Sequence, residues 1–413
     1  MVAFPPWATL VSPVPSLLIV LDALGPSPLF VRWRIQLGPG GARRLTTILV
    51  GITIAVAWVT LTSPTPITDQ APVLTCAARD LWHGVDPYTT YEPQCLSQLH
   101  FVMTSVTPLE QGPFRNNSSF PSRAQIAAVM LRDQEQGSHA GFPPYGYPPD
   151  AALLILPVAY SGWLGGAIWV AALSAILLFA IWRRGLAGAA PAFAWQMCGL
   201  ALLWTTLRWD PEILSYLLLA LAFARIDKAR LSSLAMAAAI CTNPLGWPAA
   251  PVYLAILARH HERRRRWLWL GGGVAVGFLP WLVWDHQLIG QLWRFLTLRE
   301  FPYGASLGTL ARLPSGSHLV YTSAFVAGIA VCTFLAWHWP GWRWAMAAVV
   351  YGAFILSWRG LGYYYLPIFW LSPAIVLGAI RLARSDAVAS GRALETHPGE
   401  HALDAEALSP QTG

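Results

Sequence analysis

The chain has 413 residues, of which 55% are hydrophobic and only 11% are charged, and its mean hydropathy is +0.47. A soluble domain of this size needs more polar side chains to cover its surface, so this composition excludes one and implies a membrane protein. The net charge of +7 does not indicate nucleic-acid binding, because the arginines stand in short runs beside apolar segments, as they do at the cytoplasmic flanks of membrane spans.

Apolar runs along the chain predict an all-α fold, a polytopic transmembrane helical bundle of about ten spans within residues 45–382. The clearest runs are residues 45–61, 164–182, 189–207, 267–283, 319–337, 344–356 and 364–380. We interpret residues 151–182 as one interrupted crossing. Residues 231–241 and 247–258 are interpreted as a short helical pair around Asn243-Pro244, because proline cannot continue a regular helix.

The arginine runs predict the orientation of the bundle, because positive residues favour the cytoplasmic ends of membrane spans. They place the N-terminal segment 1–44 and the tail 383–413 in the cytoplasm. The tail has no apolar pattern, so we expect it to be disordered. Two loops then face outward, residues 63–150 and residues 285–318. The sequence therefore predicts a multi-pass protein of the plasma membrane.

The first outer loop begins with a predicted helix that follows Asp69. Apolar residues recur there at helical spacing, and Gly84 ends the pattern: Val73, Leu74, Ala77, Ala78, Leu81 and Trp82. We expect an amphipathic helix that lies on the outer membrane surface. Asp69 at its start is either an N-cap, for which aspartate is a favoured residue, or a base placed close to the bilayer.

The cysteines fall into two groups. Cys198, Cys241 and Cys332 lie in apolar segments and are interpreted as core residues. Cys76 and Cys95 share the polar first loop, and they can form a disulfide if that loop faces an oxidising compartment.

The first loop contains four motifs, in chain order Asp69, Ala77-Ala78-Arg79, Gly84-Val85-Asp86-Pro87-Tyr88 and Tyr147-Pro148-Pro149. Together these motifs resemble glycosyltransferase family 87. This family comprises GT-C-fold enzymes that use polyprenyl-phosphate sugars, best known as α-mannosyltransferases of envelope glycolipids. The resemblance covers residues 69–157 closely and the remaining spans diffusely.

The resemblance implies that Asp69 is the catalytic base. It also implies that mannose moves from a polyprenyl-phosphate donor to a glycolipid or lipoglycan acceptor at the outer face of the membrane. Asp86 and Tyr88 bind substrate in this interpretation, although Asp-Pro is also a common turn after a helix. Tyr147 either lines the site or belongs to a rigid start of the next membrane segment.

Later segments depart from the family pattern. Ser306 and the downstream Arg312 are what remains of a family motif in the second outer loop. Arg359 follows Ser357-Trp358 at the outer end of a span, where it can meet the donor phosphate or extend toward lipid phosphate. Arg208 and the nearby Asp210 are candidate substrate-binding residues. The alternative is a structural pair of Arg208 with Asp210 or Glu212.

A single carboxylate base without a covalent nucleophile predicts inversion at the anomeric carbon. We find no strong metal motif, and the resemblance likewise implies a metal-independent enzyme with no cofactor besides the donor lipid. The expected partners are membrane lipids, the donor and the acceptor, and no nucleic acid. The alternatives are an arabinosyl or other pentosyl transferase, a membrane transporter, and an assembly protein without catalytic activity.

Overall fold

A computed structural model describes residues 70–88, 95, 112–117, 121–136, 145–182, 211–258, 260, 262–285, 288–297, 303–304, 318–339, 342–357, 359–360, 371, 374–375, 378–379 and 381–382. The predicted spans 45–61 and 189–207, the N-terminal segment and the tail lie outside these residues. The described part is all-α apart from two strands of two residues each.

The elements follow one another as α5 (Gln70–Trp82), η2 (Gly112–Phe114), α7 (Arg123–Gln136), α8 (Pro149–Ile155), η3 (Leu156–Val158), α9 (Gly162–Trp182), α11 (Glu212–Ala224), α12 (Ala229–Thr242), η4 (Pro244–Gly246), α13 (Ala249–Leu257), α14 (Arg263–Trp284), α15 (Leu288–Thr297), β1 (Tyr303–Gly304), α17 (His318–His338), α18 (Arg343–Val349), η6 (Val350–Leu356) and β2 (Arg359–Gly360).

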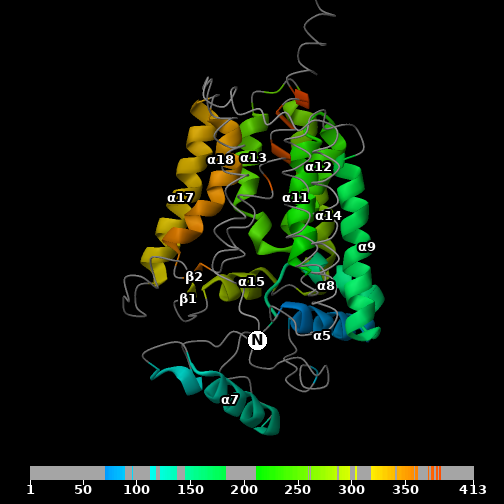
Figure 1. Cartoon of the computed structure of the whole chain (residues 1–413), viewed down its shortest axis with the longest axis vertical. Coiled ribbons are helices and arrows are strands. Elements are labelled where there is room, and N and C mark those ends of the chain that lie inside the picture. The colour runs from blue at the N-terminus through cyan, green and yellow to red at the C-terminus, as the bar shows by residue number, and fades with distance from the viewer. Residues whose placement is uncertain are drawn as a thin grey trace, which may run out of the picture.

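The long helices form a bundle, and shorter helices lie across one of its ends. Helices α9, α11, α12, α14 and α17 run along the bundle, whereas α5 and α15 lie across its lower end and α7 lies beyond them (Figure 1). Helix α11 is buried along its length, because it packs between α9 and α12. Helix α12 packs in turn against α14, while α13 and α18 pack against α17.

The two breaks in helical structure that the sequence predicts, within residues 151–182 and at Asn243-Pro244, are both present. Helix α8 passes into the single turn η3, and α9 starts only at Gly162, whose φ of 69° suits glycine. Helix α12 ends at Thr242, and the Asn243 side chain accepts a hydrogen bond from the Leu245 N–H at 2.8 Å to start η4. A β-carbon on Gly246 would lie 2.6 Å from the Ala239 carbonyl oxygen, so the turn packs too closely for any side chain there.

Two helices in the described part of the chain are long and apolar enough to cross a membrane. They are α14 and the stretch Val320–His338 of α17. Only 11% and 17% of these stretches are buried within the molecule, so their apolar side chains point outward. Val276 and Val283 of α14, for example, are 76% and 86% exposed. Outward-facing valines on a long apolar helix favour insertion into lipid.

Helix α5 differs in one respect from its sequence-based prediction. It ends at Trp82 and is followed by Gly84 at a φ of 72°, as expected. It has no open face, however, because most of its residues are buried within the molecule. One side packs on α8 and the bundle, and the other packs on a small cluster formed by the rest of the loop.

Candidate functional site

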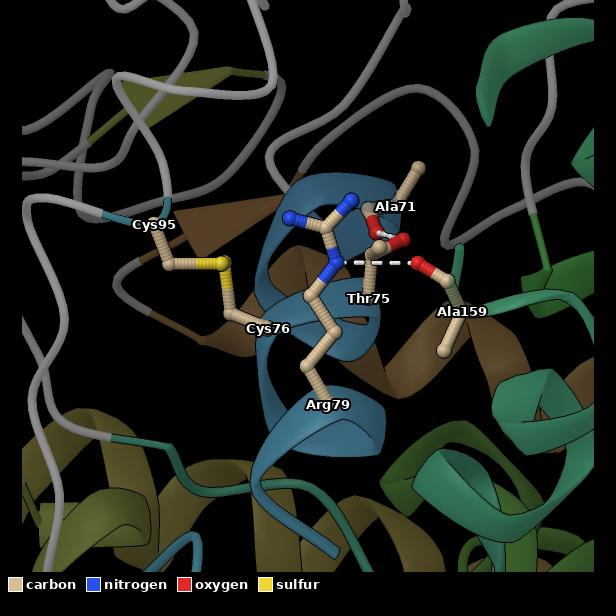
Figure 2. The surroundings of a disulfide bond; sticks show 6 residues. All are labelled: Ala71, Thr75, Cys76, Arg79, Cys95 and Ala159. Atoms are coloured by element: carbon tan, nitrogen blue, oxygen red, sulfur yellow. Dashed lines mark hydrogen bonds between the residues drawn. A yellow bond between two sulfur atoms is a disulfide. The ribbon is translucent and has the colours of Figure 1, made fainter. Parts of the chain in front are cut away.

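Helix α5 is fixed to the first loop by a disulfide. Cys76 and Cys95 are joined in the structure, so the pairing that the sequence allowed is present (Figure 2). Both cysteines belong to a small cluster of buried residues that also contains Phe114, Ile126 and Met130. The last two come from α7, so the disulfide and this cluster connect α7 to α5.

A second set of contacts fixes the other side of α5. Figure 2 shows Arg79 extending to the Ala159 carbonyl, to which its Nε donates a hydrogen bond of 2.9 Å. The same guanidinium lies 4.9 Å from the ring centroid of Tyr160, at a distance suited to a cation–π contact. His83, just past the helix, lies 2.7 Å from the Tyr160 hydroxyl. Arg79 of the Ala-Ala-Arg motif therefore orients α5 against the α8–α9 junction.

The Asp86-Pro87-Tyr88 motif forms a turn. The Asp86 carboxylate accepts a hydrogen bond from the Tyr88 N–H at 2.9 Å, which is an Asx turn. The Tyr88 hydroxyl donates to the Tyr147 carbonyl at 2.7 Å, across 59 residues of sequence. The two predicted motifs at the start and the end of the first loop are therefore in direct contact.

An aromatic cluster surrounds this contact. The Tyr88 ring centroid lies 5.0 Å from that of Tyr145 and 6.2 Å from that of Trp281 on α14. Tyr147 extends the cluster at 6.0 Å from Tyr145, and Trp284 does so at 5.4 Å from Trp281. These are edge and tilted arrangements within the distances at which aromatic rings attract one another. Small-molecule sites commonly have such aromatic walls with a few polar groups.

Carboxylates lie beside the aromatic cluster. Asp150 stands in the first turn of α8, and partial burial raises the pKa of its carboxyl group to about 6. Burial also raises the pKa of Asp86, against the hydrogen bond from Tyr88, and Asp285 and Asp80 contribute to this rise by charge repulsion. A carboxyl group with a pKa near neutrality can exchange protons at physiological pH.

Asp150 reaches this position because α14 carries a glycine opposite to it. A β-carbon on Gly277 would lie 2.5 Å from the Cys241 sulfur of α12 and 3.0 Å from the Asp150 Oδ2. The absence of a side chain therefore lets α8, α12 and α14 meet at one point. Within the described residues, the Asp150 carboxylate forms no hydrogen bond and no ion pair.

Several predicted site residues lie outside the described part of the chain: Asp69, Arg208, Asp210, Ser306 and Arg312. Gln70, the neighbour of Asp69 in the chain, is described and is buried, with 1% of its surface exposed. The backbone at Arg359 pairs in parallel with that at Tyr303, as β2 with β1. The segment that leads to Ser306 and the segment that carries Arg359 are therefore adjacent.

Four residues of this cluster were not predicted from the sequence: Tyr145, Asp150, Trp281 and Asp285. Asp150 could have been identified from the sequence, since it directly follows the Tyr147-Pro148-Pro149 motif. No sequence feature identifies Trp281 or Asp285, because nothing local in the sequence indicates that the end of α14 approaches the first loop. Among the residues that the structure describes, no group of three or more His, Cys, Asp or Glu is placed to hold a metal ion.

In the part of the chain that the structure describes, these features define a predominantly helical protein that has two helices able to cross a membrane and an aromatic and acidic cluster at one end of its bundle. Comparison with known protein families, with curated proteins and with solved structures finds no match to this chain.

Proposed function

We propose that this protein is an integral-membrane glycosyltransferase. It moves a sugar, which the family resemblance indicates to be mannose, from a polyprenyl-phosphate donor to a glycolipid or lipoglycan acceptor. One observation carries the proposal. The two motifs of the first loop, Asp86-Pro87-Tyr88 and Tyr147-Pro148-Pro149, are joined by a hydrogen bond inside an aromatic cluster at the end of the bundle.

The proposed topology is a bundle of about ten spans with this cluster at the outer face. Arginines at the opposite end of the bundle support the orientation. Arg225 donates to the Ala180 carbonyl at the end of α9, and Arg381 donates to the Ala224 carbonyl at the end of α11. Arginines at helix C-termini are stabilised by the helix dipole, and the positive-inside rule places this end in the cytoplasm.

Asp69 is the proposed base of the reaction. It accepts the proton of the acceptor hydroxyl as the hydroxyl oxygen attacks the anomeric carbon of the donor. The bond between that carbon and the phosphate oxygen breaks, and the polyprenyl phosphate leaves with the bonding electrons. Arg359 stabilises the negative charge of the departing phosphate. The displacement inverts the anomeric centre, so a β-linked donor gives an α-linked product.

The position of α5 supports this role for Asp69. The helix begins at Gln70, directly after Asp69 in the chain, and it is fixed by the disulfide on one side and by Arg79 on the other. A catalytic base must be held to a fraction of an ångström, so its supporting helix needs this kind of attachment. Tyr147 and Trp284, the accessible members of the aromatic cluster, are the proposed binding surface for the sugar ring.

The test is sugar transfer by membranes that contain the full chain. Wild type, Asp69→Asn and Asp227→Asn are incubated with radiolabelled polyprenyl-phosphate mannose and a total lipid extract. Asp227 is the matched control, because it lies just after α11 at the opposite end of the bundle, beside Lys228. Loss of the base is expected to slow transfer by about 10²–10⁴-fold. Asp227→Asn is expected to retain the wild-type rate.

Other outcomes separate the alternatives. Transfer that survives Asp69→Asn at equal protein level would reduce Asp69 to a helix cap. Transfer from a pentose donor alone would identify a pentosyltransferase. Absence of transfer from every polyprenyl-phosphate sugar would favour a transporter or an assembly protein.

A further inference from the structure

The start of α14 carries four consecutive arginines, Arg263 to Arg266. Arg266 is 1% exposed and donates to the Ile226 carbonyl, and it lies 3.4 Å from the Glu262 carboxylate. The other three are exposed. Arg266 therefore belongs to the fold, whereas Arg263, Arg264 and Arg265 form an outward-facing basic surface.

This concentration of positive charge opposes helix stability. The N-terminus of a helix already carries partial positive charge, so acidic residues are favoured there and basic residues are not. The first turn of α14 contains no acidic residue. Glu262, just before the helix, meets Arg265 at 3.5 Å as well as Arg266. The Arg264 side chain forms no hydrogen bond or ion pair with any residue that the structure describes.

Helix α12 places another cation beside α14. The Arg230 guanidinium lies 4.8 Å from the ring centroid of Trp269, which is in the second turn of α14. Arg230 is exposed, and so is the nearby Lys228. Stacking on the indole holds the Arg230 guanidinium in place and leaves its N–H groups available to an acceptor.

The residues that follow the arginines set the depth of this surface in the membrane. Trp267 and Leu268 are 47% and 69% exposed, and α14 continues as an apolar helix able to span the bilayer. Exposed tryptophan is typical of the boundary between lipid tails and headgroups. The arginines before Trp267 then stand at the level of the lipid phosphates.

We propose that the N-termini of α12 and α14 form a binding site for the headgroup of an anionic phospholipid. Arg264 contacts the headgroup beside Trp267 and Leu268, which contact the start of the acyl chains, and Arg230 adds positive charge from the neighbouring helix. Charge complementarity together with directly adjoining apolar side chains favours a lipid over a soluble phosphate, which has no apolar part to contact. The site is distinct from the proposed transfer site, and it depends on membrane insertion but not on glycosyl transfer.

The test measures thermal unfolding of the purified full chain in detergent as lipid is added. Phosphatidylglycerol is expected to raise the Tm of wild type, whereas phosphatidylcholine is not. In the variant Arg230→Gln/Arg264→Gln, the apparent affinity for phosphatidylglycerol is expected to fall by about fivefold for each arginine removed. The control is Arg132→Gln, an exposed arginine on α7 at the other end of the bundle, which is expected to behave as wild type.

Two further measurements complete the test. The variant Arg230→Lys/Arg264→Lys retains the charges and is expected to recover most of the lipid response. Inorganic phosphate and glycerol phosphate are expected to give no comparable shift, and an equal shift from either would replace the lipid site by a soluble-phosphate site. A phosphatidylglycerol response that is unchanged in the double glutamine variant would overturn the proposal.

Discussion

Replacing both Cys76 and Cys95 with serine tests whether the disulfide holds the first loop on α5. The two cysteines are 19 residues apart, and closing a loop of this length lowers the conformational entropy of the unfolded chain by an amount equivalent to about 3 kcal/mol of free energy. The buried cluster around the bond is small, comprising Phe114, Ile126 and Met130 besides the cysteines. It offers little apolar area to hold α7 in place once the bond is gone.

Limited proteolysis of the solubilised full chain measures this attachment. The open form is the state in which α7 is detached from α5. When cleavage is slow relative to reattachment, the cleavage rate follows the population of this form, so lowering the free energy of opening by about 3 kcal/mol accelerates cleavage by about a hundredfold. Trypsin cleavage after Arg132 on α7, read by mass spectrometry of the fragments, is the measurement. Glycosyl transfer is expected to fall in the same variant, because α5 loses one of its two attachments.

A matched control replaces the free buried cysteines, Cys241 and Cys332, with alanine and leaves the disulfide intact. Its cleavage after Arg132 is expected to match wild type. The reasoning fails if wild type carries the disulfide by mass spectrometry and the double serine variant is nevertheless cleaved at the same rate.

Two other changes probe the carboxylate of the site. Burial raises the pKa of Asp150 from 3.8 to about 6, so the folded state holds its proton more tightly and stability falls as pH rises through this interval. The full shift corresponds to about 3 kcal/mol, which solvent screening of this partly exposed group reduces to about 1 kcal/mol. Asp150→Asn is therefore expected to raise the Tm at pH 7.5, leave it unchanged near pH 4 and abolish this part of the pH dependence; identical pH profiles would contradict the assignment. Gly277→Ala would place a β-carbon 2.5 Å from the Cys241 sulfur and is expected to destabilise the fold by about 1–3 kcal/mol. Cys241→Ala in the same chain is expected to restore part of that loss in thermal unfolding, and additive losses would show that the two positions do not meet.

Local features of the fold were predictable from the sequence because they depend on local chemistry. Gly84 follows the end of α5, the helical run breaks between η3 and α9, and the chain changes direction from α12 into η4 at Asn243-Pro244. Each case depends on a residue whose backbone preference acts within a few positions. The all-α class likewise follows from long apolar runs.

The surroundings of α5 could not be predicted in the same way. Helical periodicity identified its apolar face, but the burial of the opposite face depends on the cluster around Cys95 and α7. The approach of Trp281 to Tyr88 joins positions almost two hundred residues apart, and it requires the whole bundle. The close approach of Asp150 to α14 likewise depends on Gly277, which lies on another helix.

The disulfide of α5 also implies an order of assembly during synthesis. Cys76 and Cys95 are made close together in time, so in the proposed topology they can be oxidised as soon as the first loop is exported. Trp281, which packs against Tyr88 at the other side of the site, is synthesised long afterwards. In the proposed topology, a cell that delays oxidation would therefore leave the segment around Cys95 unattached to α5 while the later helices are still being synthesised, and that segment would be open to proteases at that stage.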